Sequence, residues 1–486
     1  MPTPFSRVRA AAIDSRLANV LKRQEELERL HQTLVRNASA ITDAITHDSD
    51  HTPAEAAVEY HLALSTVKEQ YASLRPAQQL EDEYRIARGA DAPDRREAGG
   101  IVYIVPTTHT LFFSVVAPLS AALAAGNCVV IQLENNLRTL PGLLRGLLRS
   151  ALDNDIIDFS TSRPDDADFL ARCTEVLQTG AEQPPKANHI VSPAQERVIA
   201  VVDQTANLQE AARALVTARF SFGGKSPYAP DMLLVSEFSK KDLLDAVVQQ
   251  SIGFLTAQNG AVVGETRTTA ARGDGARDLL DEVQKEGGTR VVTTGSNGTI
   301  LDVQKRDSAA FRRKITECCL CVHAVSSLDD AIDLANSYDT LLATYVFANP
   351  PSAKYLAQFI NARVAFVNHV PTELLVGPAS PLNEAVNPNL RYPTTLFSMP
   401  RPQYTSAPQR SALLAEVLRS GSAKEIQRLP AALKTEELGA MMRPMGGGIG
   451  YFEQGILTGL GMVLTPTLAA MGVLGWYAVK TMTARR

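Results

Sequence analysis

The 486-residue chain has few cysteines, five in all, and three of them stand in one short run. So small and clustered a set does not provide a disulfide framework, and it suggests a reducing compartment. The run Cys-Cys-Leu-Cys at 318–321 also permits a soft-metal interpretation, but no second pair of Cys or His at ligand spacing accompanies it. We therefore interpret the run as an apolar strand and expect no metal site.

A strong net charge and an apolar leader are also missing. Lysine and arginine number 48, and aspartate and glutamate number 52, which leaves a formal net charge of −4. Because nucleic-acid binders need a basic face, we expect no nucleic acid among the partners. Residues 1–23 include several arginines but no apolar run long enough for a signal peptide.

Charged side chains are absent from residues 455–479, GILTGLGMVLTPTLAAMGVLGWYAV. A helix of this length extends about 37 Å, enough to cross the hydrocarbon core of a bilayer. Trp476 and Tyr477 stand where interfacial aromatic residues are expected. A buried core helix is the alternative, but Pro466 is tolerated better in a membrane helix. We predict a transmembrane anchor at 455–479, preceded by a glycine-rich hinge at 445–450. The body then faces the cytosol, and the organelle stays open.

The rest of the chain combines helical and strand patterns. Residues 1–80 have the spacing of amphipathic helices, and Thr52 followed by Pro53 is typical of a helix start. From residue 101 onward, apolar runs of strand length such as IVYIVP, CVVIQL, RVIAVVD and CLCVHAV alternate with helical segments. This alternation is typical of parallel sheets covered by helices. We predict an α/β fold with two wound lobes.

Five segments in chain order resemble the aldehyde dehydrogenase superfamily. They are VAPLSAALAAGNCVVIQLEN, AVVDQTANLQEAARALV, FSFGGKSPYAPDMLLV, SSLDDAIDLANSYDTLLATYVFAN and TTLFSMPRP. The helical beginning and the apolar tail are most similar to the membrane-bound class 3 (fatty) aldehyde dehydrogenases. The resemblance implies 1–80 as N-terminal helices, 81–202 as a degenerate nucleotide-binding lobe, 203–378 as a catalytic-type lobe, 379–405 as an oligomerisation strand with its return segment, and 406–454 as a linker. It also implies a homodimer.

The family's catalytic residues are not found at the matching positions. The family attacks an aldehyde with a cysteine thiolate, and the position that matches this cysteine in GKSPYAPD is Pro227. The position of its general base falls at Pro193 or a neighbour, and we interpret Glu196, three residues on, as a solvated charge. Spacing back from an AAGN turn places His109 at the position of the asparagine that stabilises the oxyanion, with Thr108 as the alternative.

The family's cofactor contacts are eroded in the same way. Its ribose-binding lysine corresponds to Gln132, and its nicotinamide-ribose glutamate corresponds to Lys314. The segment LQTGAEQPPKANH is shorter than the family pattern and contains two prolines, so the helix that docks the phosphate is expected to be missing. The resemblance therefore implies no cofactor, and NAD or NADP only if the dehydrogenase alternative holds.

A tunnel lined by former active-site positions is still expected, with His109, Ser226, Tyr228 and His369 as its polar members. For His109 the alternative is a residue that merely closes a turn at a strand end. Three hypotheses for function remain. The first is a membrane-associated binding or regulatory subunit, with a protein partner. The second is a non-oxidative enzyme acting on an apolar small molecule, with His109 as acid or base. The third is a noncanonical NAD(P)-dependent aldehyde oxidoreductase.

Overall fold

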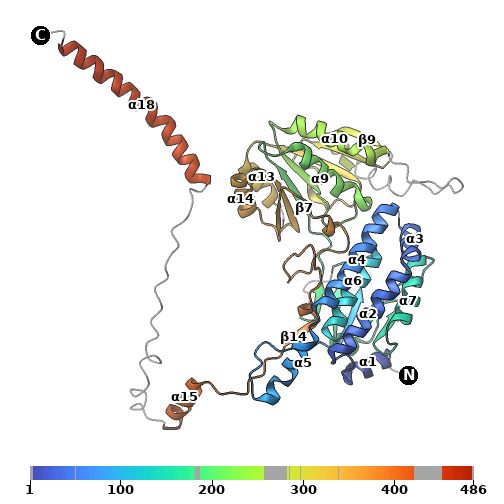
Figure 1. Cartoon of the computed structure of the whole chain (residues 1–486). Coiled ribbons are helices and arrows are strands. Elements are labelled where there is room, and N and C mark those ends of the chain that lie inside the picture. Colours follow the sequence, from blue (N-terminus) through green and yellow to red (C-terminus); the bar gives the residue numbers. More distant parts are fainter. Residues whose placement is uncertain are drawn as a thin grey trace. The chain divides into compact units, whose positions relative to one another are not determined.

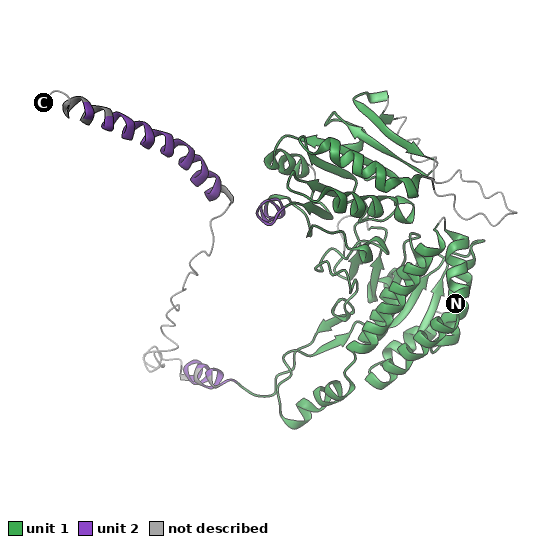
Figure 2. Ribbon diagram, turned by 45° about the horizontal axis from the view of Figure 1, so that its top comes forward, with its two compact units in different colours: residues 1–348, 359–407 green, residues 349–358, 408–486 purple. Residues whose placement is uncertain are grey.

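The computed structural model describes residues 4–49, 51–180, 186–256, 282–283, 285–295, 297–337, 339–420 and 451–483. The chain divides into two compact units (Figure 2). The first comprises residues 1–348 and 359–407, and the second comprises residues 349–358 and 408–486. All of the sheets and both hydrophobic cores belong to the first unit. The predicted hinge at 445–450 lies outside the described residues.

The chain begins with helices, as predicted. They are α1 (Ser6–Ile13), α2 (Val20–Arg36), α3 (Ala38–Asp48), α4 (Pro53–Ser73), α5 (Pro76–Arg85) and the short η1 (Ile86–Arg88). Thr52 is the N-cap of α4 and forms a reciprocal capping box with Glu55. Helix α4 packs along α6 (Leu111–Ala125), and α2 packs against both α4 and α7 (Thr139–Ala151) (Figure 1).

The first sheet has five parallel strands in the order β4-β3-β2-β5-β6. Their bounds are β2 (Ile101–Val105), β3 (Cys128–Gln132), β4 (Ile157–Ser160), β5 (Cys173–Leu177) and β6 (His189–Val191). The chain moves outward from β2 to β4 and then returns to the other side of β2 through α8 (Ala167–Arg172). The order therefore reverses between β2 and β5, and parallel sheets of this kind bind ligands beyond the strand ends at such a point.

The connection from β5 to β6 differs from the other connections in this sheet. Between Leu177 and His189 the structure describes no helix, and residues 181–185 lie outside the described residues. Helix α6, which precedes β3, ends at Gly126, whose φ of 94° is a conformation that favours glycine.

The second sheet has seven strands in the order β13-β12-β7-β8-β11-β10-β9. Only β9, which pairs with β10, is antiparallel to its neighbour. The strands are β7 (Val198–Val202), β8 (Met232–Ser236), β9 (Thr289–Gly295), β10 (Gly298–Val303), β11 (Cys319–Val325), β12 (Ala343–Phe347) and β13 (Ala365–Val367). The predicted span 81–202 thus ends with a strand of this second sheet. Its helices are α9 (Leu208–Phe220), η2 (Ser221–Gly224), α10 (Lys240–Thr256), α12 (Ala309–Arg312) and α13 (Leu328–Asn336).

The two sheets confirm the predicted α/β fold with two wound lobes. A small two-stranded sheet pairs β1 (Arg96–Ala98) with β14 (Ser398–Pro400), which lies within the predicted oligomerisation segment. Two short turns, η3 (Thr372–Leu375) and η4 (Thr394–Phe397), lie between β13 and β14.

The second unit contains α14 (Pro350–Phe359), whose last residue belongs to the first unit, α15 (Gln409–Ser420) and α18 (Tyr451–Thr483). Within α18, residues 453–476 form a 24-residue apolar segment with a mean hydropathy of 1.7, and none of it is buried. The segment is long and apolar enough to cross a membrane. An exposed apolar helix of this length fits the predicted anchor, which stays a prediction.

Candidate functional site

One side chain, that of Gln178, spans the point between β2 and β5 at which the strand order of the first sheet reverses. Gln178, which follows β5, accepts a hydrogen bond from the Thr107 amide at 3.0 Å and donates one to the Ser114 carbonyl at 2.8 Å. The amide of Gln178 therefore joins the end of β5 to the loop after β2 and to α6. Because Gln178 is only 4% exposed, it forms part of the core at this point.

His109 lies in the loop between β2 and α6. The next residue, Thr110, adopts a left-handed backbone with φ 47°, and its hydroxyl oxygen accepts a hydrogen bond from the Gly377 amide at 2.8 Å. His109 Nε2 lies 3.2 Å from the Leu375 carbonyl oxygen. Since a carbonyl only accepts, Nε2 carries the hydrogen and Nδ1 holds a lone pair. Burial, and next the Coulombic effect of the His51 side chain, lower the pKa of His109 to about 3, so its ring is neutral at pH 7.

A second histidine and a glutamate lie beside His109. The rings of His51 and His109 are 6.2 Å apart, edge to face, and both lie edge-on to the ring of Phe222. His51 Nδ1 is 3.8 Å from Glu59 Oε2, which is longer than a hydrogen bond. The other oxygen of Glu59 accepts from the Phe113 amide in the first turn of α6 at 3.2 Å. That position favours a negative charge because it is the positive end of the helix dipole.

A small cavity of about 30 Å³, room for one or two water molecules, lies beside this group. Its lining comes from α3, α4 and the beginnings of α6 and α7. His51, Glu59 and Thr110 contribute its polar wall, Leu111 and Leu140 contribute apolar surface, and Asp48 and Arg138 also line it. None of the residue pairs around this pocket was visible as a pattern in the sequence, although Glu59 stands four residues after Glu55 on one helix.

The loop that follows α9 contains three of the predicted positions. Pro227 stands between Ser226, which is 1% exposed, and Tyr228, which is fully buried. The Ser226 hydroxyl oxygen accepts from the Tyr228 amide at 3.3 Å, and the Tyr228 hydroxyl accepts from the Ser380 amide at 3.2 Å. The buried guanidinium of Arg391 lies 5.7 Å from the Tyr228 ring centre. The polar groups of Ser226 and Tyr228 are thus engaged in the core.

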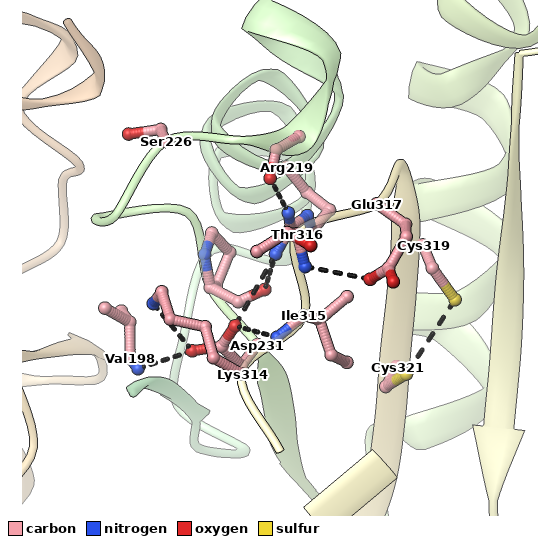
Figure 3. Close-up of polar contacts among 12 residues, drawn as sticks. Val198, Arg219, Ser226, Asp231, Lys314, Ile315, Thr316, Glu317, Cys319 and Cys321 are labelled. Atoms are coloured by element: carbon pink, nitrogen blue, oxygen red, sulfur yellow. Dashed lines mark hydrogen bonds and ion pairs between the residues drawn. The ribbon is translucent and has the colours of Figure 1, made fainter. Parts of the chain in front are cut away.

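An internal network of charges supports the same loop (Figure 3). The carboxylate of Asp231 accepts hydrogen bonds from the Val198 amide at 2.7 Å and the Ile315 amide at 2.9 Å, and from Lys314 Nζ at 3.2 Å. Arg219 lies 3.7 Å from the other side of this carboxylate. Lys314 also donates to the Pro227 carbonyl at 2.8 Å. Burial lowers the pKa of Lys314, while the neighbouring Asp231 carboxylate opposes that shift.

A glycine makes the close approach in this loop possible. Gly224 has φ 72°, and a Cβ added there would lie 2.6 Å from the Glu317 carbonyl oxygen. The Gly224 carbonyl also accepts a hydrogen bond from Arg219. Any other residue at this position would therefore force the loop away from the segment that leads into β11.

The remaining predicted residues lie elsewhere. His369 is exposed, and its Nδ1 faces the carbonyl oxygen of Val367, two residues earlier in the chain. Gln132 accepts a hydrogen bond from the Tyr103 hydroxyl at 2.7 Å. Glu196 lies at the surface, where both of its carboxylate oxygens are 2.6 Å from the guanidinium of Arg363. The catalytic assignments of His109, Ser226 and Tyr228 stay predictions.

All five cysteines lie in or directly before strands. Each is at most 3% exposed, and none forms a disulfide: Cys128, Cys173, Cys318, Cys319 and Cys321. Burial raises the pKa of Cys128 and of Cys173 to about 12. Residues 319–321 of the run form the start of β11, and Cys318 directly precedes it, which confirms the interpretation as an apolar strand.

Comparison with known proteins gives one family. A family model described as the aldehyde dehydrogenase family matches residues 6–144 and 197–379, so the match is interrupted over the part that contains β5 and β6. The chain is 23% identical over 368 residues to 4,4'-diaponeurosporen-aldehyde dehydrogenase of Staphylococcus aureus, covering 68% of this chain and 76% of that protein. It is 24% identical over 277 residues to aldehyde dehydrogenase family 3 member B2 of Mus musculus, covering 52% and 56%.

Solved structures share the fold. AldH of Staphylococcus aureus in its substrate-bound state superposes with a TM-score of 0.68 at 19% identity, covering 86% of this chain and 98% of that one. A mutant of aldehyde dehydrogenase C from Pseudomonas syringae, complexed with NAD+ and octanal, gives a TM-score of 0.65 at 16% identity, covering 83% and 88%. At these identities the likeness establishes the fold, and the mouse protein confirms that distant relatives include class 3.

Proposed function

Since the chain belongs to the aldehyde dehydrogenase family, we propose that it binds apolar aldehydes or related carbonyl compounds without oxidising them through a cysteine thiolate. It is then either a membrane-associated binding subunit or an enzyme with a non-oxidative reaction. In this proposal the chain keeps the α/β fold of the family, while the residues at the family's catalytic positions differ from those that the family uses.

The burial of every cysteine carries this proposal. The family's reaction requires a thiolate that can reach the substrate. The chain has five thiols, and each is enclosed in a sheet, where burial raises the pKa of Cys128 and Cys173 to about 12. The loop from Gly224 to Asp231 holds none of them. At its centre stands Pro227, whose carbonyl is bound to Lys314.

Membrane attachment fits the same proposal. The segment 453–476 is apolar and exposed, and we propose that it anchors the protein as a tail, with the body in the cytosol. An anchored protein meets apolar carbonyl compounds where they concentrate. The β1–β14 pair supports a further proposal of a homodimer, since it falls within the segment that resembles the family's oligomerisation strand.

An NAD- or NADP-dependent aldehyde oxidoreductase with unusual residues is the second candidate. The relatives favour it more directly, because those named above are aldehyde dehydrogenases and one solved structure holds NAD+ and octanal. Two observations weigh against it in this proposal. A phosphate is commonly bound at a helix N-terminus, and the residues described between β5 and β6, 178–180 and 186–188, form no helix. Gln178 also joins the two loops at the reversal point of the sheet.

The test uses the full chain in detergent micelles. NAD, NADP and octanal are titrated by calorimetry, with thermal unfolding measured alongside, since a ligand of the folded state must raise its melting temperature. We expect octanal to bind, its matched alcohol octan-1-ol to bind more weakly, and neither nucleotide to bind. Nucleotide binding together with octanal-dependent formation of the reduced cofactor would establish the second candidate. Absence of octanal binding would refute the first.

A further inference from the structure

The first unit contains a groove with a volume of about 670 Å³ at the amino-terminal edge of the first sheet. Gly100, just before β2, and Cys128, the first residue of β3, line it. The rest of the lining comes from the ends of α1, α4 and α6, from α5, and from the ribbon of β1 and β14. A groove of this volume has room for a small molecule. It lies at the opposite strand ends from Gln178 and His109.

The lining of the groove combines apolar and charged side chains. Ala11, Leu17, Val20 and Ala124 are among its buried apolar members. Five arginines and four acidic residues also line it, and none of the nine is fully buried. Apolar surface next to charged groups suits a ligand that has both an apolar body and a charged head.

Most of these charges are neutralised by ion pairs. Three of the five arginines and three of the four acidic residues are paired, at distances of 2.8–3.6 Å: Arg16 with Asp153 and Asp155, Arg85 with Asp82 and Asp94, and Arg95 with Glu97. Within the described part of the chain Arg23, Arg96 and Glu83 form no ion pair. The unpaired charges on the lining are therefore two guanidiniums and one carboxylate.

Arg23 is held in place by three neutral acceptors. Its Nη1 donates to the Ala124 carbonyl at 2.9 Å, and its Nη2 donates to the Ala18 carbonyl at 3.2 Å and to Gln79 Oε1 at 2.9 Å. A guanidinium has five N–H groups, so one hydrogen on Nη1 and the hydrogen on Nε remain. The Nε atom is buried and has no partner among the residues that the structure describes. Burial also lowers the pKa of Arg23, as expected for a cation without a neighbouring carboxylate.

Arg96, in β1, is fixed in the same manner. Its Nε donates to the Ser398 hydroxyl at 2.9 Å, and its Nη2 donates to the Thr395 carbonyl at 2.9 Å and the Ser398 carbonyl at 2.6 Å. Both hydrogens on Nη1 remain. Guanidiniums that the protein already orients are suited to carboxylate and phosphate oxygens. We propose that the groove binds a small organic anion, which is recognised by Arg23 and Arg96.

The lining defines the chemical class of this anion. Its head is a carboxylate or a phosphate, since both present the oxygens that guanidinium N–H groups bind. Its body is apolar and lies against the buried apolar residues of the groove. The carboxylate of Glu83 on the lining disfavours a second negative group on the ligand. This site is additional to the proposed binding of carbonyl compounds and does not rest on it.

Phenyl phosphate is the probe, titrated by calorimetry into the full chain in non-ionic detergent micelles, with thermal unfolding measured alongside. We expect it to bind, inorganic phosphate to bind more weakly because it lacks an apolar body, and the uncharged benzyl alcohol not to bind. A parallel titration with benzoate shows whether a carboxylate or a phosphate is the preferred head. Arg23→Gln and Arg96→Gln should each weaken binding at least tenfold. Arg36→Gln and Arg88→Gln, exposed arginines outside the groove, are matched controls and should bind as wild type does.

Loss of affinity in both groove variants and in neither control supports the inference. If neither phenyl phosphate nor benzoate binds, or if Arg96→Gln binds as tightly as wild type, the anion site is refuted. Arg96 is exposed, so its variant decides the question even where Arg23→Gln does not fold. Equal affinity for inorganic phosphate and phenyl phosphate would refute the apolar part of the site. Octanal binding, measured on the same samples, tests the proposed function separately, and either proposal can fail while the other stands.

Discussion

Acidification should destabilise the fold through His109 in particular. The pKa of this residue in the folded protein is about 3, against an ordinary value of 6.5, because its ring is buried beside His51. A histidine with a lowered folded pKa stabilises the fold fully above its unfolded pKa, and this contribution is lost as the pH falls toward its folded pKa. Between pH 6.5 and pH 3 the unfolded chain therefore binds a proton that the folded chain does not.

The size of the effect follows from this window. One pKa unit corresponds to 1.36 kcal/mol, so the loss from one such site between pH 7 and pH 5 is about 2 kcal/mol. His109→Gln removes the titration and keeps a side-chain N–H that reaches the Leu375 carbonyl. Urea unfolding of both proteins at pH 7 and pH 5, in micelles and followed by circular dichroism, measures the difference. We expect the free energy of unfolding to fall by about 2 kcal/mol more in wild type than in the variant.

Equal losses in the two proteins would refute this reasoning, because they would mean that His109 is hydrated enough to bind its proton in the folded state. The matched control is His61→Gln on the exposed face of α4. It should retain the full pH dependence of wild type, since it leaves His109 and the residues around it unchanged.

Three further outcomes are expected. Lys314→Met leaves the buried carboxylate of Asp231 without its ammonium partner and should lower the free energy of unfolding by about 3–5 kcal/mol. The loss should be smaller when Lys314→Met is combined with Asp231→Asn, and urea unfolding measures both values. Iodoacetamide should label none of the five cysteines in the folded protein and all of them in 6 M guanidinium, with the number of labels read from the intact mass. A cysteine that is rapidly labelled in the folded protein would contradict their burial. Deleting residues 451–486 should move the protein from the membrane pellet to the supernatant, and retention in the pellet after a carbonate wash would disprove the anchor.

Local sequence signals predicted much of the fold. Thr52, Pro53 and Glu55 lie within four residues of one another, so the start of α4 could be recognised without any tertiary contact. The apolar runs of β2, β3, β7 and β11 were long enough to be recognised as strands. The short strands β4, β5 and β6 were not singled out, because each has three to five residues and carries polar side chains such as Glu175 and His189.

The surroundings of the candidate site depend on contacts that the sequence does not display. Lys314 and Asp231 are 83 residues apart, and their pairing follows from the alignment of β8 beside β11. Tyr228 is enclosed because its hydroxyl meets Ser380, 152 residues further along the chain. Ser226 and Tyr228 became candidates for a tunnel wall because they flank Pro227, the position that resembles the family's nucleophile.

The loop around Pro227 obtains its shape from folding alone. Asp231, Lys314 and Arg219 tie it to three parts of the second lobe. The conformational entropy of ordering this loop is therefore lost when the chain folds, and a molecule that later contacts the loop does not have to order it again. This preorganisation raises the affinity for ligands that match the shape of the loop. It also restricts the choice of ligands, because a rigid loop cannot close around a molecule that fits poorly.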